Sequence, residues 1–155
     1  MLPDSLYWEK IEEGDDLPSL VKDVTATTVI YGAIAARDFM PAHHDRDFAQ
    51  KCGMKDIYMN SPVTTGWACK YLTDWTGPSS ELKRISLRFG SPCFPGDTLT
   101  WRGKVVRKYI NDEQHLVDVE YSATILETGH CTGTATIRLP TKVQYACADT
   151  CVNRQ

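Results

Sequence analysis

The chain lacks the patterns that mark several classes of protein. Six of its 155 residues are cysteines, yet no two have C-x-x-C spacing, so the paired ligands typical of a structural zinc site are missing. No apolar run approaches the roughly 18 residues that a membrane-spanning helix needs. The net charge of −3 argues against the broad basic surface of a nucleic-acid-binding protein. We therefore expect neither a membrane nor a nucleic-acid partner.

The first residues, MLPDSLYWEKIEEGDD, also lack the basic and apolar regions of a secretory signal peptide. We expect a cytoplasmic protein whose cysteines are free and mostly buried, because that compartment keeps thiols reduced. The length suits one domain with a sizeable core. Residues 1–140 are predicted to form this domain, and residues 141–155, which show no clear period, are predicted to form a C-terminal tail.

The second half of the chain has the alternating apolar pattern of an antiparallel sheet. Short turn sequences such as Asn111-Asp112 and Thr128-Gly129 separate the apolar runs. The runs are four in number: 82–89, 98–109, 116–126 and 130–139. Because each run follows the last after a short turn, the pattern predicts a four-stranded meander.

A long helix is predicted before these strands. Trp67, Tyr71 and Trp75 recur at every fourth position of residues 63–75, and Gly77-Pro78 ends the pattern. Apolar residues on all sides indicate a buried helix. Shorter segments are expected to be extended at 8–12 and 20–24, and helical at 27–36 and 45–52. The fold class is therefore α+β, with an antiparallel sheet wrapped around a central helix, and its free sheet edge favours a dimer.

The stretch RDFMPAHHDRDFA (residues 37–49) concentrates polar chemistry in a short space. One interpretation is a metal site, although adjacent His43 and His44 lack the i,i+4 spacing of a helical zinc site. A second is a solvated loop with no chemical role. A third is acid/base catalysis, since Pro41 bends the chain so that Asp38 and His43 can converge on one water molecule. Composition alone leaves the three open.

The spacing of these residues resembles a known family. Asp38, Pro41 and His43, followed by Asp45, Ala49 and Gly53, resemble the signature of MaoC-like (R)-specific enoyl-CoA hydratases, which have the hot-dog fold. Residues 94–105 (FPGDTLTWRGKV) are similar to a strand–turn–strand segment of that family. TDWTGP (residues 73–78), with HHDRD and KDIYMN, is similar to the small catalytic subunit of steroid side-chain enoyl-CoA hydratases. The resemblance covers residues 35–139.

The resemblance implies an activity and a set of site residues. It implies a hot-dog enoyl-CoA hydratase in which Asp38 and His43 activate water. At the start of the central helix, Asn60, Thr64 and Gly66 are the candidate residues for binding the thioester carbonyl. Asn60 has the alternative role of a helix cap, and Gly66 that of close packing between helix and sheet. His44 is expected to be a structural hydrogen-bonding residue, and no cofactor or metal is required.

Two other functions remain open. A hot-dog thioesterase would use a carboxylate on or near the central helix, for which Asp74 and Glu81 are the available residues. A non-catalytic acyl-CoA-binding subunit is the second, because the resemblance implies a heteromer with another hydratase-like chain as an alternative to a homodimer. The chain departs from the family in having Met40 where asparagine is common, and MNSPVTTGW in place of a His-Gly-Met helix entry. These departures affect the substrate more than the reaction.

Overall fold

The structure is a computed structural model that describes residues 5–142, so most of the predicted tail, with Cys147 and Cys151, lies outside the described residues. Five strands, three α-helices and two short 3₁₀ helices make up the described chain. In order they are η1 (Trp8–Lys10), β1 (Asp16–Asp23), α1 (Ala26–Ala35), η2 (Pro41–His43), α2 (Arg46–Lys51), α3 (Ser61–Thr76), β2 (Glu81–Phe89), β3 (Thr98–Asn111), β4 (Gln114–Ile125) and β5 (Thr128–Arg138).

All strand pairs in the sheet are antiparallel, and the strand order is β1-β3-β4-β5-β2. The predicted four-stranded meander is therefore wrong for its first strand. β3, β4 and β5 do form a meander, but β2 pairs with β5 at one edge, where Arg88 lies opposite Thr132. The turn after β2 leads away from that edge instead of forming a hairpin. A run of short turns indicates neighbours along the sequence, and it does not fix which strands pair.

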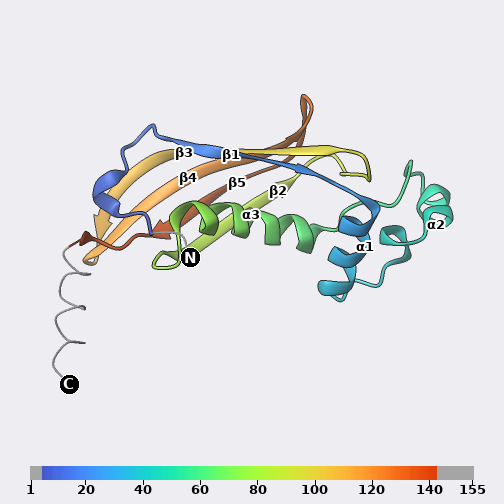
Figure 1. The fold of residues 1–155 in the computed structure, drawn as a ribbon, viewed down its shortest axis with the longest axis horizontal. Coiled ribbons are helices and arrows are strands. Elements are labelled where there is room, and N and C mark those ends of the chain that lie inside the picture. Colours follow the sequence, from blue (N-terminus) through green and yellow to red (C-terminus); the bar gives the residue numbers. More distant parts are fainter. Residues whose placement is uncertain (1–4, 143–155) are drawn as a thin grey trace, which may run out of the picture.

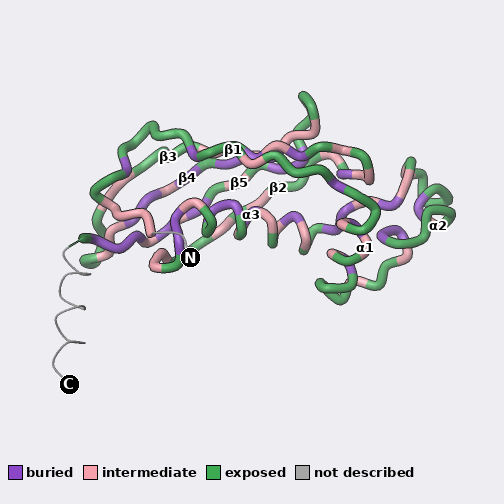
Figure 2. Tube along the Cα trace, in the orientation of Figure 1, coloured by how far each residue is buried: buried purple, intermediate pink, exposed green. Residues whose placement is uncertain are grey.

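Helix α3 lies along one face of the sheet, and the core fills the space between them (Figures 1 and 2). Tyr71 of α3 contacts Trp101 of β3, which in turn contacts Tyr121 of β4. The Tyr121 ring lies across β5 because Gly133 has no side chain there; a Cβ at Gly133 would lie 2.5 Å from the ring. The Tyr121 hydroxyl donates a hydrogen bond to the Ser86 carbonyl oxygen at 2.9 Å. The expected sheet packed on a central helix is confirmed, but α3 is buried along one face and exposed along the other, so the predicted burial on all sides is wrong.

The front half of the chain forms an edge strand and a small group of helices at one end of α3 (Figure 1). The expected helix at 27–36 is α1, which Thr25 caps together with Thr28. The helical turn at 45–52 is α2, and Asp45 caps it as expected. Residues 20–24 fall largely within β1, whereas residues 8–12 were expected to be extended and instead contain η1. The short helices bring residues 38–60 next to the start of α3.

The described cysteines are free, as expected, and differ in burial: Cys93 and Cys131 are buried, Cys69 is half-buried and Cys52 is exposed. The expectation of mostly buried thiols therefore holds for only half of them. Within residues 5–142, every helix is too short or too polar to cross a membrane.

Candidate active site

Asp38 lies in the connection between α1 and η2, where the backbone turns sharply. Arg37 has a positive φ of 53°, and the Asp38 N–H donates to the Ala33 carbonyl at the end of α1. One carboxylate oxygen, Oδ1, accepts the Met40 N–H at 3.3 Å. These backbone contacts direct the other oxygen, Oδ2, toward the start of α3.

His43 is the last residue of η2 and is buried, with only 6% of its surface exposed. Its Nδ1 lies 2.7 Å from the Tyr58 carbonyl oxygen. A carbonyl can only accept a hydrogen bond, so this contact places the proton of a neutral ring on Nδ1. The other nitrogen, Nε2, lies 3.4 Å from Asp38 Oδ2. In this tautomer the carboxylate and Nε2 are both acceptors, and a water molecule beside both atoms would donate one O–H to each.

Asn60 supports the carboxylate and also begins α3. Its side-chain N–H donates to Asp38 Oδ2 at 2.9 Å, and its side-chain oxygen accepts the Val63 N–H as a helix cap. The Asn60 hydrogen bond is the largest influence on the pKa of Asp38 and lowers it from its ordinary value, against the opposing effect of burial. The Met40 N–H and the charge of His43 lower this pKa by smaller amounts. Asp38 is therefore an ionised acceptor at neutral pH.

The first turn of α3 leaves one backbone donor free. Pro62 has no N–H, and the N–H groups of Val63 and Thr64 are bonded to the side chain and carbonyl of Asn60. The N–H of Ser61 has no partner within residues 5–142. It lies next to Asn60, at the positive end of the helix dipole. Sequence reasoning did not identify Ser61. Its N–H is free only because Asn60 occupies the other N–H groups of the first turn, and this bonding is visible only in the structure.

The structure places the other predicted binding residues on different sides of α3. Thr64 is buried, and its hydroxyl lies against a side chain of β5, so its direct contact with a substrate stays a prediction. Gly66 is exposed, and a Cβ added there would have nothing within 4 Å, so it does not pack against the sheet. A ligand can approach Gly66 closely, although in a regular helix its N–H already points to the Pro62 carbonyl. Its binding role also stays a prediction.

Residues 46–59 pack against the His43 ring, and several contacts fix the position of this segment. The Tyr58 ring packs edge-on against His43 at 4.9 Å between centroids. Arg46 forms a two-pronged ion pair with Asp56, both contacts measuring 2.9 Å. The Met59 N–H donates to the Cys93 carbonyl, which ties this segment to the loop after β2. These bonds fix the Tyr58 carbonyl that orients the His43 ring.

Several large apolar side chains are exposed in residues 31–40, the segment that contains Asp38. The Asp38 side chain is 30% exposed, and the next two residues, Phe39 and Met40, are 69% and 47% exposed. Tyr31 and Ile34, one turn apart on α1, are 67% and 54% exposed. So many exposed apolar groups in one short segment indicate a surface that binds an apolar group or another protein.

The remaining polar candidates have structural contacts. Asp74 pairs with Lys70 on the surface of α3, and Glu81 pairs with both Lys83 and Arg138. Neither carboxylate lies near the Asp38–His43 pair, because both are at the opposite end of α3. The ring of His44 is exposed and has no hydrogen bond within the described chain, so its expected structural role is not observed.

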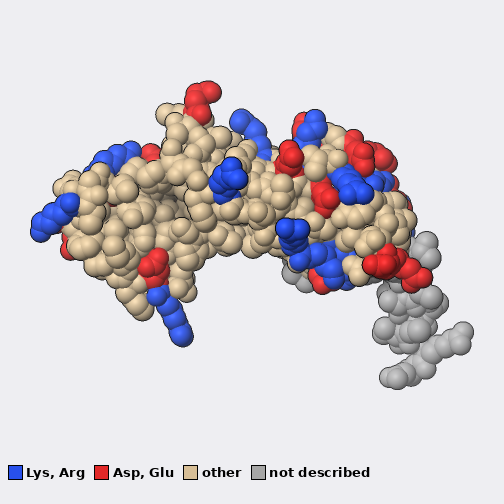
Figure 3. Space-filling view, turned by 180° about the vertical axis from the view of Figure 1, so that it is seen from behind, with Lys and Arg blue, Asp and Glu red and all other residues tan. Residues whose placement is uncertain are grey.

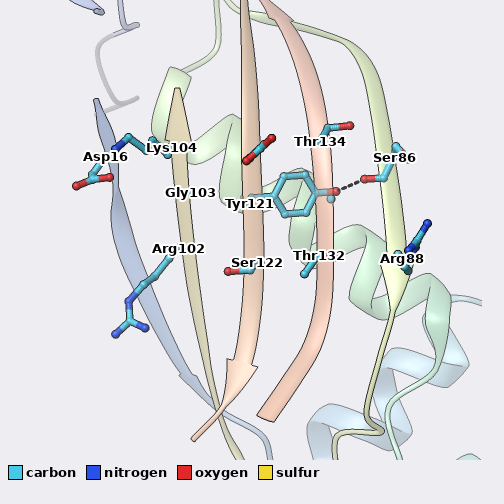
Figure 4. Close-up of a pocket in the computed structure, with 12 residues that line it drawn as sticks. Asp16, Ser86, Arg88, Arg102, Gly103, Lys104, Tyr121, Ser122, Thr132 and Thr134 are labelled. Atoms are coloured by element: carbon cyan, nitrogen blue, oxygen red, sulfur yellow. Dashed lines mark hydrogen bonds between the residues drawn. The ribbon is translucent and has the colours of Figure 1, made fainter. Parts of the chain in front are cut away.

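A groove of about 590 Å³ lies on the outer face of the sheet, and its lining does not include Asp38 or His43. Its charged residues include Arg88, Arg102, Lys104 and Glu120. In Figure 4 the side chains of Arg88 and Arg102 point in opposite directions, away from the middle of the groove. Figure 3 shows charged groups crowded at the end opposite α1 and α2. We therefore regard the groove as a solvated sheet face.

Residues 5–142 contain no group of three or more His, Cys, Asp or Glu side chains arranged to hold a metal ion. The candidate site offers the side chains of Asp38, His43 and Asn60 together with backbone N–H groups.

Comparison with known proteins decides the family, because the MaoC like domain matches residues 13–125. The chain belongs to the MaoC-like family. It is 43% identical over 99 residues to the 3-oxo-4,17-pregnadiene-20-carboxyl-CoA hydratase beta subunit of Mycobacterium tuberculosis, covering 64% of this chain and 75% of that protein. It is 28% identical to the (R)-specific enoyl-CoA hydratase of Rhodospirillum rubrum, covering 88% of this chain and 93% of that protein.

Solved structures agree with this assignment. A chain of the ChsH1-ChsH2 complex from Mycobacterium tuberculosis superposes with a TM-score of 0.76 at 38% identity, covering 83% of this chain and 98% of that chain. The (R)-hydratase from A. caviae superposes with a TM-score of 0.75 at 24% identity, covering 85% and 99%, and shows the fold. The predicted family and the α+β hot-dog fold are confirmed. The names of the relatives agree with the predicted hydratase chemistry.

Proposed function

We propose that the chain is an enoyl-CoA hydratase that adds water across a trans-2-enoyl-CoA thioester and catalyses the reverse dehydration of a 3-hydroxyacyl-CoA. The observation that carries this proposal is the approach of two acceptors, His43 Nε2 and Asp38 Oδ2, to 3.4 Å at the open start of a helix. Two acceptors that share one donor are the arrangement that positions a water molecule and removes its proton.

Asp38 and His43 bind and deprotonate the attacking water in this reaction. Asp38 and His43 each accept one hydrogen of the attacking water, and one of these protons leaves as the water oxygen bonds to the β-carbon. The electron pair of the double bond moves toward the thioester carbonyl. The same pair returns the proton to the α-carbon, so no proton is gained or lost overall. Asn60 keeps Asp38 ionised and aimed at the water.

The thioester oxygen needs a donor while it carries negative charge. We assign this role to the backbone N–H of Ser61, the free donor of the first turn of α3, assisted by the positive end of the helix dipole. Gly66 leaves open space on the exposed side of the same helix, where the thioester chain can lie against the backbone. No metal or organic cofactor enters this scheme.

The acyl group is proposed to be bulky and apolar, as in a steroid side chain, and the active form to contain a second chain. Four exposed apolar residues of the segment that contains Asp38 support both proposals, because a small acyl group would cover little of their surface: Tyr31, Ile34, Phe39 and Met40. Similarity to a hydratase beta subunit and to a chain of a two-protein complex supports a heteromer. We place the enzyme in the cytoplasm.

The alternative functions have weaker support. The carboxylates available to a thioesterase, Asp74 and Glu81, are engaged in surface ion pairs away from Asp38. A silent acyl-CoA-binding subunit would have no need of the Asp38–His43 pair, which is present and supported by Asn60.

Loss of absorbance of the conjugated enoyl-thioester band tests the reaction. We would follow it with crotonyl-CoA and with a steroid side-chain enoyl-CoA, for the chain alone and with a co-purified second chain. Hydration of the steroid thioester, abolished by Asp38→Asn in a protein that still folds, is the expected result. Turnover by Asp38→Asn at the wild-type rate would refute the assignment. Thiol release without hydration would instead establish a thioesterase.

A further inference from the structure

A buried histidine on β5 contacts the first turn of α3 and has no part in the scheme above. His130 is 4% exposed, and its Nε2 lies 3.0 Å from the hydroxyl oxygen of Thr64, which is itself 1% exposed. On the other side of the ring, Nδ1 lies 2.8 Å from the Ser91 carbonyl oxygen. The ring therefore joins the loop after β2 to the start of α3.

The partners fix the protonation of the His130 ring. Ser91 offers a carbonyl, which only accepts, so Nδ1 carries the hydrogen and Nε2 of the neutral ring accepts the Thr64 O–H. Burial lowers the pKa of His130, against small opposing effects of the Ser91 hydrogen bond and the charge of Asp97. Thr64 thus donates its only hydroxyl proton to His130, which agrees with the longer 3.4 Å separation between its oxygen and the Asn60 carbonyl.

Thr64 connects this ring to the site through the backbone of Asn60. The Thr64 N–H donates to the Asn60 carbonyl at 3.2 Å, and the Asn60 side chain donates to Asp38 at 2.9 Å. The loop after β2 is also bonded to the start of β5, because the N–H groups of Gly90 and Ser91 donate to the carbonyls of His130 and Gly129. A continuous series of hydrogen bonds therefore runs from β5 to the Asp38 carboxylate.

We infer that His130 is a positioning residue: by accepting the Thr64 hydroxyl it fixes the first turn of α3, so that Asn60 holds Asp38 beside His43 and Ser61 presents its N–H. The kinetic test of this inference rests on the proposed function, whereas the pKa of Asp38 can be measured without any substrate.

Three variants distinguish the two hydrogen bonds of the His130 ring, one with Thr64 and one with Ser91. Thr64→Val removes the hydroxyl with little change of shape, and Thr64→Ser restores it. His130→Asn can keep a donor for Ser91, but it loses the acceptor for Thr64. The matched control is Thr76→Val, the same substitution at the other end of α3, where the buried Thr76 hydroxyl bonds to the Leu72 carbonyl and to Ser80.

The first readout is the pKa of Asp38, followed through its carboxyl carbon by NMR in the intact chain. We expect the pKa to rise toward its ordinary value in Thr64→Val and in His130→Asn, to return in Thr64→Ser, and to stay unchanged in Thr76→Val. If Thr64→Val and His130→Asn fold and leave the pKa of Asp38 where it is in the wild type, the inference is wrong.

The second readout is kinetic, in the assembled enzyme. We expect kcat to fall about tenfold in His130→Asn, which corresponds to loss of roughly one hydrogen bond, while KM stays within about twofold because His130 has no substrate contact in the proposed scheme. If Thr76→Val lowers kcat equally, the effect is one of general stability and the inference fails. If the Asp38 pKa responds as expected but the wild type does not hydrate either thioester, the proposed function fails and the positioning role stands.

Discussion

The two ends of α3 carry similar side chains and serve different purposes. At the start, a buried threonine hydroxyl contacts His130, and the capping Asn60 contacts the Asp38 carboxylate. At the end, another buried threonine, Thr76, bonds to Leu72 and Ser80, and Gly77 closes the helix with a positive φ of 79°. Both ends satisfy their buried polar groups, but only the first connects them to ionisable side chains.

The difference shows that the hydrogen bond alone does not make a residue functional. A buried hydroxyl must be satisfied wherever it lies, so its bond contributes to stability at either end. At the start of α3 the Asn60 side chain also lowers the pKa of Asp38, and the Asn60 backbone carbonyl accepts the N–H of the buried Thr64. Substitutions at the first end should therefore change catalysis, whereas those at the second should change stability only.

The largest effect is expected at the first end, from replacing adjacent histidines one at a time. His43→Ala should lower kcat about 10²- to 10⁴-fold, the usual contribution of a general acid or base. His44→Ala should leave kcat near the wild-type value, because that side chain is exposed and the ion pair with Asp38 is made by His43. The enoyl-thioester assay measures both, and equal losses in the two variants would contradict the site.

A smaller effect is expected when the two functions of Asn60 are separated. Asn60→Ser keeps an oxygen that can cap α3 but loses the N–H that lowers the pKa of Asp38. The carboxylate should then protonate at a higher pH, so the acid limb of the kcat profile should move upward and kcat should fall about tenfold.

Asn60→Ala, which loses the cap as well, should show the same acid limb and a lower melting temperature. The stabilising contribution of Asp38 is present above the ordinary carboxyl value of 3.8 and is lost as pH falls through its lowered pKa. A pH profile identical to the wild type in both variants would show that Asn60 does not control Asp38.

At the second end we expect a loss of stability without a loss of activity. Thr76→Val should reduce the free energy of unfolding by about 1 kcal/mol, because the Ser80 hydroxyl loses its buried partner. Urea unfolding measures this change, and kcat at a temperature well below the transition should match the wild type. A clear fall in kcat of Thr76→Val would contradict the idea that only the start of α3 affects catalysis.

The smallest effect concerns the pH dependence of stability. The folded pKa of His130 lies below the ordinary 6.5, so its neutral form stabilises the fold above that value and this contribution declines as pH falls below it. His130→Gln should therefore lose less stability than the wild type between pH 7.5 and 5.5 in urea unfolding. An equal loss in both proteins would show that His130 is not held neutral.

Local patterns predicted the parts of the molecule that depend on neighbours in the sequence. The apolar spacing of residues 63–75 predicted α3, which extends over Ser61–Thr76, and the aspartate at 45 predicted a cap that is present. Family spacing identified Asp38 and His43, and the structure brings their side chains together. Both cases involve residues only a few positions apart.

Contacts between distant residues could not be predicted in this way. The pairing of β2 with β5 depends on the register of the whole sheet, so a run of short turns led to an incorrect meander. His130 lies 66 positions from Thr64 and 39 from Ser91, and nothing near it in sequence marks it as a polar contact. Ser61 was missed because its free N–H depends on how its neighbours are bonded.

The pairing of β2 with β5 also affects the order in which parts of the chain fold during synthesis. Arg88 pairs with Thr132, and the loop after β2 is held by His130, so these contacts close long loops of chain. Contacts of this kind slow folding and form late. During synthesis, the residues of the site leave the ribosome well before the strand that fixes them. We therefore expect the candidate site of the nascent chain to stay incomplete, with the surrounding apolar side chains exposed, until β5 has emerged.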